Sequence, residues 1–145
     1  MLFIASDHAG FELKAAMLKE LKGKTETEDL GTDSLESCDY PLFAKKLADK
    51  VLANSGSLGL LMCGTGIGMS IAANKLKGIR AAAVSDNVSA QFAREHNNAN
   101  VLCLGSRVLN VKQALECLNA FLNAKFDTTS PRHQRRIDEI TSFEK

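Results

Sequence analysis

The residues best suited to chemistry lie in one stretch, where Cys63 is followed by the glycine-rich segment Gly64–Gly68. The uncharged apolar run Leu58–Met62 before the cysteine predicts a fully buried parallel strand, and Ile71–Lys75 can form a helix after the glycines. A helix that starts after a glycine loop exposes unpaired N–H groups and the positive end of its dipole. The stretch therefore predicts a ring of hydrogen-bond donors for an anion or a developing oxyanion, with a thiol at its lip.

Three other interpretations of this loop can be compared with the first. The loop lacks the Lys-Ser/Thr ending of a nucleotide P-loop, and Met69 breaks the Gly-x-Gly-x-x-Gly pattern of dinucleotide-binding folds. A dinucleotide site stays open as an alternative because Asp86 follows at about the spacing of a ribose-binding acid. A tight strand-to-helix turn without a ligand is the remaining alternative, although one glycine would suffice for it.

Length and composition describe an ordinary globular chain. Its 145 residues predict one domain spanning residues 1–145, with 45% apolar and 24% charged side chains. The net charge of +1 gives no reason to expect a nucleic-acid or membrane partner, and no run suits a signal peptide or a membrane span. The four cysteines are widely separated, without a Cys-x-x-Cys pair, so we expect reduced thiols and a cytoplasmic location.

Strand-like and helix-like segments alternate along the chain. This order predicts a three-layer α/β/α, Rossmann-like fold with a five-stranded, mainly parallel sheet and a C-terminal helical tail. The predicted strands are Leu2–Ser6, Glu26–Leu30 at a sheet edge, Leu58–Cys63, Ile79–Val84 and Val101–Leu104. The predicted helices are Phe11–Leu21, Pro41–Val51, Ile71–Lys75, Ser89–Glu95, Val111–Leu122 and a tail helix between Arg132 and Phe143.

Polar residues follow several of these strands. Asp7 and His8 follow the first strand, and Ser106-Arg107 follows the last. Because the carboxyl ends of parallel strands share one edge of a sheet, we expect these residues to meet Cys63 there. Helix capping for Asp7, and a partly buried loop position for His8, remain equally open from the residues alone.

His96 and Asn97 precede a strand and therefore belong to the opposite edge of the sheet. They can reach the same site if a second copy of the chain presents them. The sequence thus predicts an active site shared between two subunits.

The tail contains a basic cluster between Arg132 and Arg136. In a helix these two arginines are four residues apart on one face, where their guanidinium groups can bind one phosphate. A solvated charge run is the alternative. Nearby acids almost cancel the charge and no aromatic residues interleave with the arginines, so a nucleic-acid surface is not indicated.

Together these residues suit cofactor-free proton transfer on a small phosphorylated substrate. Cys63 is the natural base, because a helix N-terminus favours the thiolate form of a nearby cysteine. The alternative for Cys63 is a small buried hydrophobe, the fate that we expect for Cys103 and Cys117.

Several motifs occur in order from Phe3 to about Phe143. They are Ser-Asp-His-Ala-Gly-Phe, Cys-Gly-Thr-Gly-Ile-Gly-Met-Ser-Ile-Ala-Ala-Asn-Lys, Gly-Ile-Arg-Ala, His-Asn-Asn-Ala-Asn-Val, Leu-Gly-Ser-Arg and Arg-His-Gln-Arg-Arg. This combination resembles the ribose-5-phosphate isomerase B family, which also contains galactose-6-phosphate and allose-6-phosphate isomerases. The resemblance implies interconversion of ribose 5-phosphate and ribulose 5-phosphate, in the non-oxidative branch of the pentose phosphate pathway, through a cis-enediolate without metal or organic cofactor.

The resemblance also implies roles for single residues. Cys63 would be the proton-transferring base, and His96, supplied with Asn97 across the interface of a homodimer or dimer of dimers, would open the sugar ring. The oxyanion loop, with its hydroxyl on Thr65, would comprise Gly64, Thr65, Gly66, Ile67 and Gly68. The sugar contacts would be Asp7 and His8, and the phosphate ligands Arg107, Arg132 and Arg136.

Some relatives lack the thiol and use a Glu just after the last glycine, a position held here by Met69. Methionine cannot accept the proton, so Cys63 and Met69 agree on the thiol-dependent branch of the family. The alternatives are a hexose 6-phosphate (allose or galactose 6-phosphate) as substrate, or a non-catalytic sugar-phosphate-binding module.

Overall fold

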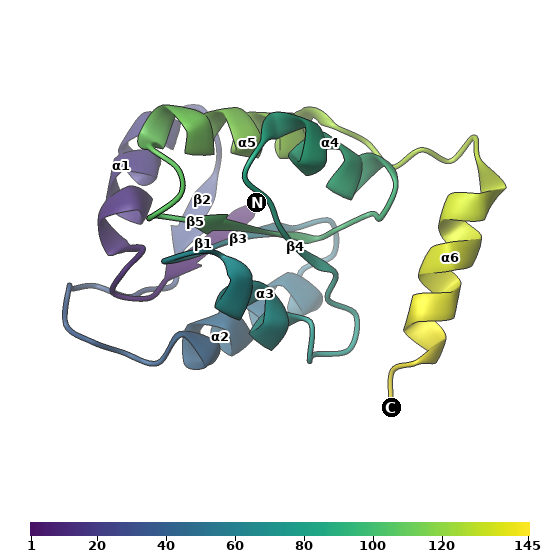
Figure 1. Cartoon of the computed structure of the whole chain (residues 1–145), viewed down its shortest axis with the longest axis horizontal. Helices are drawn as coiled ribbons and strands as arrows, with labels where there is room; N and C mark the ends of the chain where they lie inside the picture. The colour runs from purple at the N-terminus through teal and green to yellow at the C-terminus, as the bar shows by residue number, and fades with distance from the viewer.

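Five parallel strands form the centre of the molecule, in the order β2-β1-β3-β5-β4 (Figure 1). The computed structural model describes residues 1–145. The strands are β1 (Leu2–Ser6), β2 (Thr27–Asp29), β3 (Leu58–Cys63), β4 (Ala81–Ala83) and β5 (Val101–Gly105). The predicted α/β class and parallel sheet are confirmed.

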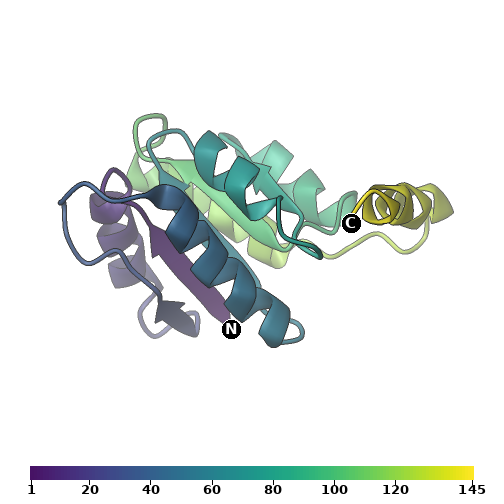
Figure 2. The same cartoon turned by 90° about the horizontal axis from the view of Figure 1, so that it is seen from below.

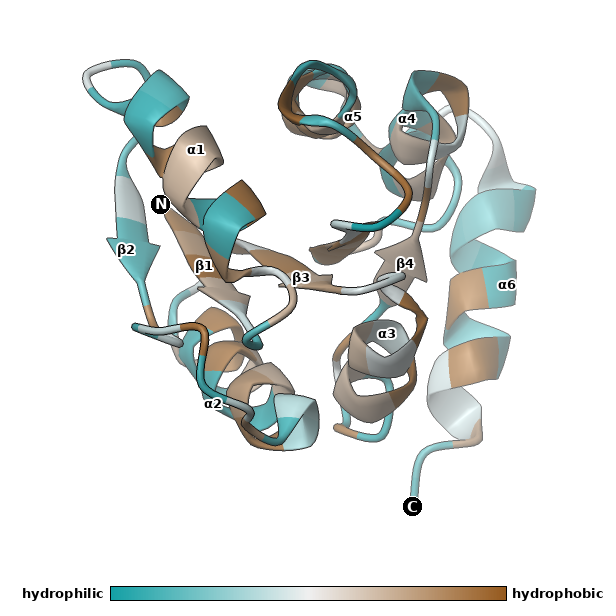
Figure 3. Ribbon diagram, turned by 60° about the vertical axis from the view of Figure 1, so that its left-hand side comes forward, coloured by the Kyte–Doolittle hydropathy of each residue, from teal (hydrophilic) through white to brown (hydrophobic).

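Six helices accompany the sheet. They are α1 (Phe11–Leu21), α2 (Tyr40–Ala53), α3 (Ile67–Ala73), α4 (Asn87–Glu95), α5 (Val111–Asn123) and α6 (Pro131–Ser142). Helices α1, α4 and α5 cover one face of the sheet, and α2 and α3 cover the other (Figure 3). The predicted three layers are therefore present. None of the helices is both long and apolar enough to span a membrane.

Successive side chains of the central strands point to opposite faces of the sheet, and this divides the core into two clusters. In β1, Leu2 and Ile4 pack with α1 and α5, whereas Phe3 and Ala5 pack with α2. Because successive side chains of a strand point to opposite faces, a strand covered on both faces must be apolar throughout. Strands β1 and β5 are fully buried, as is β3 apart from its first residue, so the strand that ends in Cys63 is rigidly held.

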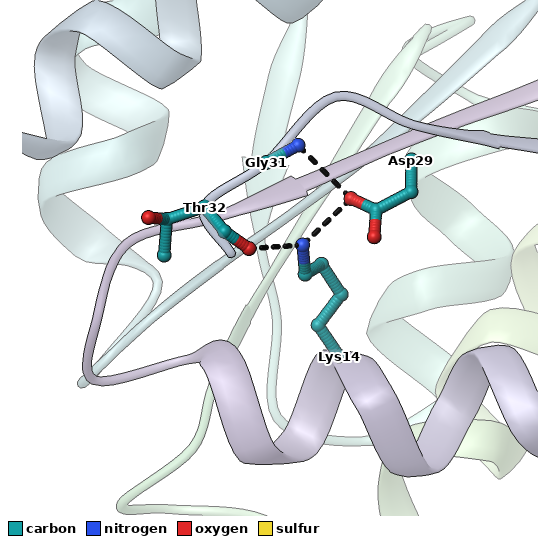
Figure 4. Close-up of polar contacts among 4 residues, drawn as sticks. All are labelled: Lys14, Asp29, Gly31 and Thr32. Atoms are coloured by element: carbon teal, nitrogen blue, oxygen red, sulfur yellow. Dashed lines mark hydrogen bonds and ion pairs between the residues drawn. The ribbon is translucent and has the colours of Figure 1, made fainter. Parts of the chain in front are cut away.

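A buried lysine fastens the edge strand β2 to helix α1 (Figure 4). The ammonium of Lys14 lies 2.6 Å from both the Asp29 carboxylate and the Thr32 carbonyl oxygen. Asp29 also accepts a 2.9 Å hydrogen bond from the Gly31 amide. Lys14 thereby also anchors the start of the connection that leads to α2.

Helix α6 stands outside the three layers (Figure 2). Only its residues His133 and Ile137 are buried, and the amide of Gly78 donates to the Glu144 carboxylate at 3.0 Å just beyond the helix. The predicted tail helix is present, and it leaves most of its surface free for a partner.

Most element boundaries agree with the prediction to within two residues, and the differences at α3 and β4 have physical causes. Helix α3 begins at Ile67 rather than Ile71, because Gly66 adopts a left-handed conformation with φ 82° and turns the chain directly into the helix. Strand β4 is limited to Ala81–Ala83, because the amide of Ile79 donates to the Leu76 carbonyl of the preceding turn at 3.2 Å.

Candidate active site

Three strands end side by side around Cys63. The amide of Asp7, after β1, donates to the Met62 carbonyl at 3.1 Å. After β5, the amide of Ser106 donates to the Cys63 carbonyl and that of Arg107 to the Gly64 carbonyl, both at 2.9 Å. The backbone thus fixes Asp7, Cys63 and Arg107 along one edge, where the sequence placed them.

The Cys63 side chain receives a hydrogen bond from the glycine loop. The amide of Gly66 points at the Cys63 sulfur at 3.2 Å, and the amide of Ile67 donates to the Thr65 hydroxyl at 3.2 Å. An N–H donor at this distance stabilises negative charge on sulfur. The loop therefore directs a backbone donor at the Cys63 sulfur and holds the Thr65 hydroxyl through the Ile67 amide.

The glycines of the loop have no side chain, so other groups can approach the loop backbone closely. A Cβ on Gly64 would lie 3.1 Å from a terminal nitrogen of Arg107, and one on Gly68 only 2.8 Å from the Tyr40 ring. Arg107 and Tyr40 therefore lie directly against the glycine loop. Tyr40 begins α2, far from the loop in sequence.

His8 is held by the connection between β2 and α2. The amide of Cys38 donates to Nδ1 of His8 at 3.2 Å. A backbone amide can only donate, so Nδ1 accepts and the proton of the neutral ring is on Nε2. His8 and Arg107 line a hollow of about 590 Å³, to which Ser106 and Asn110 also contribute.

Asp7 lies beside this hollow with its carboxylate buried. One carboxylate oxygen accepts a 3.0 Å hydrogen bond from the Gly10 amide just before α1. The N-cap of α1 is Gly10, without a side-chain cap, so Asp7 does not cap the helix; its bond to Gly10 instead fixes the carboxylate in place at the edge of the sheet.

The other cysteines differ from Cys63 in their surroundings. Cys63 belongs to the same core cluster as Cys103, and Cys117 to the other, but Cys103 and Cys117 are more deeply buried, at 0% and 1% exposed against 6% for Cys63. Burial raises the pKa of Cys103 far above its usual range, with the neighbouring charge of Cys63 adding to the effect, and burial also raises the pKa of Cys117. Cys103 and Cys117 are thus inert core residues, as predicted, while Cys63 meets the loop donors.

A family profile described as Ribose/Galactose Isomerase matches residues 2–140, which is almost the whole chain. The chain belongs to the ribose/galactose isomerase family. Ribose-5-phosphate isomerase B of Escherichia coli K12 is 44% identical over 139 residues, covering 95% of this chain and 92% of that protein. The resemblance drawn from the motifs is therefore confirmed.

Solved structures of the ribose/galactose isomerase family superpose closely on this chain. Ribose-5-phosphate isomerase B from Clostridium thermocellum gives a TM-score of 0.94 at 42% identity, covering 99% of this chain and 96% of its own. The enzyme from Mycoplasma genitalium, solved with bound ribulose 5-phosphate, gives 0.92 at 47% identity, covering 99% and 95%. Sequence and fold thus agree over the full length.

The remaining residues that the family resemblance assigns lie at the tail. His96 stacks on His133 of α6, with ring centroids 4.5 Å apart and planes inclined by 14°, and on Phe92 on its other side. Arg136 joins the two histidines and Asn97 around a small pocket of about 230 Å³. We divide the candidate site into two halves. The tail half comprises His96, Asn97, Arg132 and Arg136. The sheet-edge half comprises Cys63, the loop Gly64–Gly68, Asp7, His8 and Arg107.

The two halves lie at opposite ends of strand β3. The carbonyl of Asn100, in the turn after His96, accepts from the amide of Gly59 at the start of β3, whereas Cys63 ends that strand. This separation follows the order of the elements in the sequence, in which His96 and Asn97 precede a strand and Cys63 ends one. Within one chain, therefore, His96 does not lie beside the Cys63 loop.

His133 was not assigned a role from the sequence, although it lies between the two tail arginines. Its side chain is buried and its Nε2 atom has no hydrogen-bond partner. Burial lowers the pKa of His133, and the charges of His96 and Arg132 lower it further. The Asp127 carboxylate, 3.7 Å from Nε2, acts in the opposite direction on this pKa, and the ring of His133 forms a stacking surface for His96.

The dinucleotide alternative depended on Asp86, which has another role in the structure. Its carboxylate caps α4, accepting from the Ser89 amide at 2.7 Å and from the Ser89 hydroxyl at 2.9 Å. These bonds lower the pKa of Asp86. No group of three or more His, Cys, Asp or Glu side chains is arranged to hold a metal ion.

Proposed function

We propose that this chain interconverts D-ribose 5-phosphate and D-ribulose 5-phosphate by proton transfer. The observation that carries the proposal is the Gly66 amide on the Cys63 sulfur, at the end of a buried strand, in a chain of the ribose/galactose isomerase family. The relatives named ribose-5-phosphate isomerase B, one solved with ribulose 5-phosphate, support the choice of substrate.

The chemistry needs one base and one anion-stabilising loop. The Cys63 thiolate removes the C2 proton of the open-chain aldose, the C–H electron pair forms the C1=C2 bond, and O1 becomes an oxyanion facing the loop amides. The thiol then returns the proton to C1 while the O2 hydroxyl proton passes to O1. The ketone forms at C2 without oxidant, reductant or added cofactor.

The tail half supplies what the sheet-edge half lacks. Ring opening requires a proton to move from the O1 hydroxyl to the ring oxygen, which suits the imidazole of His96. Arg132 and Arg136 add cations to Arg107 for the phosphate. Since the two halves are apart within one chain, the site is completed by a second copy in a homodimer, and a dimer of dimers keeps the same arrangement.

The exposed faces of the tail support this assembly. Most of α6 is free of contacts with its own chain, and Ile140 and Phe143 leave apolar surface exposed there. The four unpaired cysteines fit a reducing compartment, and we place the enzyme in the cytoplasm.

Turnover of ribose 5-phosphate by the metal-stripped protein tests the reaction, with allose 6-phosphate as the comparison substrate. We expect Cys63→Ala to abolish turnover, and Cys117→Ala, a matched change in the core, to retain it. Near-normal turnover by Cys63→Ala would assign the base to another residue. Turnover of allose 6-phosphate alone would make a hexose 6-phosphate the substrate. Binding of either sugar phosphate without turnover would indicate a sugar-phosphate-binding module.

Mixing two inactive variants tests the shared site. A hybrid dimer of Cys63→Ala and His96→Gln chains has one site with both substitutions and one with neither. Random exchange of subunits makes half of the dimers hybrids, so about a quarter of the wild-type activity should return. Unmixed variants remain inactive. If exchange is verified and no activity returns, both halves act within one chain and the shared site is refuted.

A further inference from the structure

The turn between α4 and β5, His96–Asn100, carries both members of the tail half that do not belong to α6. Its backbone is irregular, because Asn98 adopts a left-handed conformation with φ 44°. A left-handed conformation is less favourable for a residue with a side chain than for glycine, so contacts from the surroundings help to hold this turn.

Arg80, just before β4, provides that support. Its Nε atom donates to the carbonyl oxygens of Asn97 and Asn98 at 3.1 and 3.0 Å, and one terminal nitrogen donates to the Asn98 oxygen at 2.8 Å. A planar guanidinium group can bind two neighbouring acceptors in a fixed geometry, which an ammonium cannot do. Arg80 therefore holds the peptide units between Asn97 and Asn98 and between Asn98 and Ala99, the second and third after His96.

Backbone groups of Gly78 and Arg80 hold the other end of the turn, at Asn100. The amide of Arg80 donates to the Asn100 side chain at 2.8 Å, and the Asn100 amide donates back to the Arg80 carbonyl at 3.0 Å. The Asn100 side chain also donates to the Gly78 carbonyl at 2.8 Å. Both ends of the turn are thus bound to residues Gly78–Arg80.

A second arginine approaches the turn from α4. Arg94 donates to the Asn98 side-chain oxygen at 3.1 Å and to the Ala99 carbonyl at 2.6 Å. Its guanidinium group rests 5.7 Å from the centre of the Phe121 ring in the core. Arg94 connects the turn to the hydrophobic core, whereas Arg80 binds the carbonyl groups one and two residues after His96.

The imidazole of His96 makes no hydrogen bond within the chain. Only its stacking on Phe92 and His133 and the backbone of the turn determine where its nitrogens point. We infer that Arg80 is a positioning residue for ring opening, which holds His96 through the carbonyl groups of Asn97 and Asn98. This inference rests on the role proposed for His96.

Two assays on the same protein separate ring opening from proton transfer. Ribulose 5-phosphate is an open chain, because its O5 carries the phosphate and cannot close a five-membered ring. Exchange of its C1 hydrogen in D₂O therefore requires Cys63 but no ring opening. Isomerisation of ribose 5-phosphate, which is mostly cyclic, requires both steps.

We expect Arg80→Gln to lower kcat for ribose 5-phosphate by about 10- to 100-fold, since small displacements of a catalytic group have effects of this size. Exchange at C1 of ribulose 5-phosphate should stay within about twofold of the wild type. Arg80→Lys keeps the positive charge but not the planar guanidinium group. It should also lower isomerisation more than hydrogen exchange, with a smaller loss of kcat than Arg80→Gln. Arg135→Gln, an exposed arginine without a hydrogen bond to its own chain, should leave both rates unchanged.

An equal loss of both rates in Arg80→Gln and Arg80→Lys would overturn the inference, because it would show general structural damage. Unchanged rates in both variants would also overturn it. His96→Gln must also lower isomerisation more than hydrogen exchange if His96 opens the ring, so a His96→Gln protein with full isomerisation would refute the role of His96 and the inference with it. Wild-type protein that neither isomerises nor exchanges would instead refute the proposed function itself.

Discussion

Replacing Lys14 by Met tests whether a buried cation stabilises this fold. The Lys14 side chain is 1% exposed, and its ammonium makes hydrogen bonds of 2.6 Å to Asp29 and to the Thr32 carbonyl. Methionine has a similar length and no charge, so it removes both bonds while filling most of the same space. The surface pair Lys45–Asp49 has a similar distance of 2.7 Å with side chains 64% and 56% exposed, and provides the matched control.

The expected change in the free energy of unfolding depends on the two hydrogen bonds that are lost and on the desolvation cost that the substitution removes. Hydrogen bonds to charged groups contribute about 1.5–3 kcal/mol each. Removing the ammonium also removes its desolvation cost, which is several kcal/mol for a buried ion. The Asp29 side chain is 42% exposed and keeps its hydrogen bond from the Gly31 amide, so its charge remains solvated and hydrogen-bonded after the substitution. We expect Lys14→Met to lower the free energy of unfolding by about 1–3 kcal/mol, and Lys45→Met by at most about 0.5 kcal/mol.

Urea denaturation at one fixed protein concentration measures both changes, because the stability of the proposed dimer depends on concentration. A lower midpoint for Lys14→Met, with an unchanged slope, would agree with the calculation. Equal effects at the two sites, or a more stable Lys14→Met protein, would show that the buried ammonium is tolerated and that the desolvation cost dominates.

Three further predictions concern the loop and the tail. Gly66→Ala should destabilise the fold by about 1–2 kcal/mol in urea denaturation and lower kcat, because φ 82° is unfavourable for alanine and this amide holds Cys63. Arg136→Gln should raise KM for ribose 5-phosphate about tenfold or more, while Arg135→Gln should not. The lowered pKa of His133 means that the unfolded chain binds a proton more readily, so stability should fall as pH drops below about 6.5. His133→Phe should reduce that loss in denaturation curves between about pH 7.5 and 5.5, and an undiminished loss would assign it to other groups.

The central part of the fold could be predicted from local patterns. Strands β1, β3 and β5 are continuous apolar runs, and each is followed by polar residues that the parallel arrangement brings to one edge. Strand β2 was predicted with its edge position. The start of α3 could not be predicted, because it depends on the backbone conformation of Gly66, which the residue type permits but does not require.

The candidate site was predictable where it depends on residues next to strand ends. The contacts that hold those residues were not, because they join distant parts of the chain. Nothing near Arg80 in sequence indicates the turn at His96, and nothing near Cys38 indicates that its amide meets His8. Such partners become visible only when the tertiary structure brings the segments together.

The outer strands of the sheet have a consequence for the protein at high concentration. Strands β2 and β4 contain three residues each, so the sheet presents only short rows of unpaired peptide groups at its borders. Short edges give neighbouring molecules little to extend into a shared ladder, which is the first step of fibril growth. The small size of these two strands therefore protects a sheet whose interior strands, if exposed, would aggregate readily.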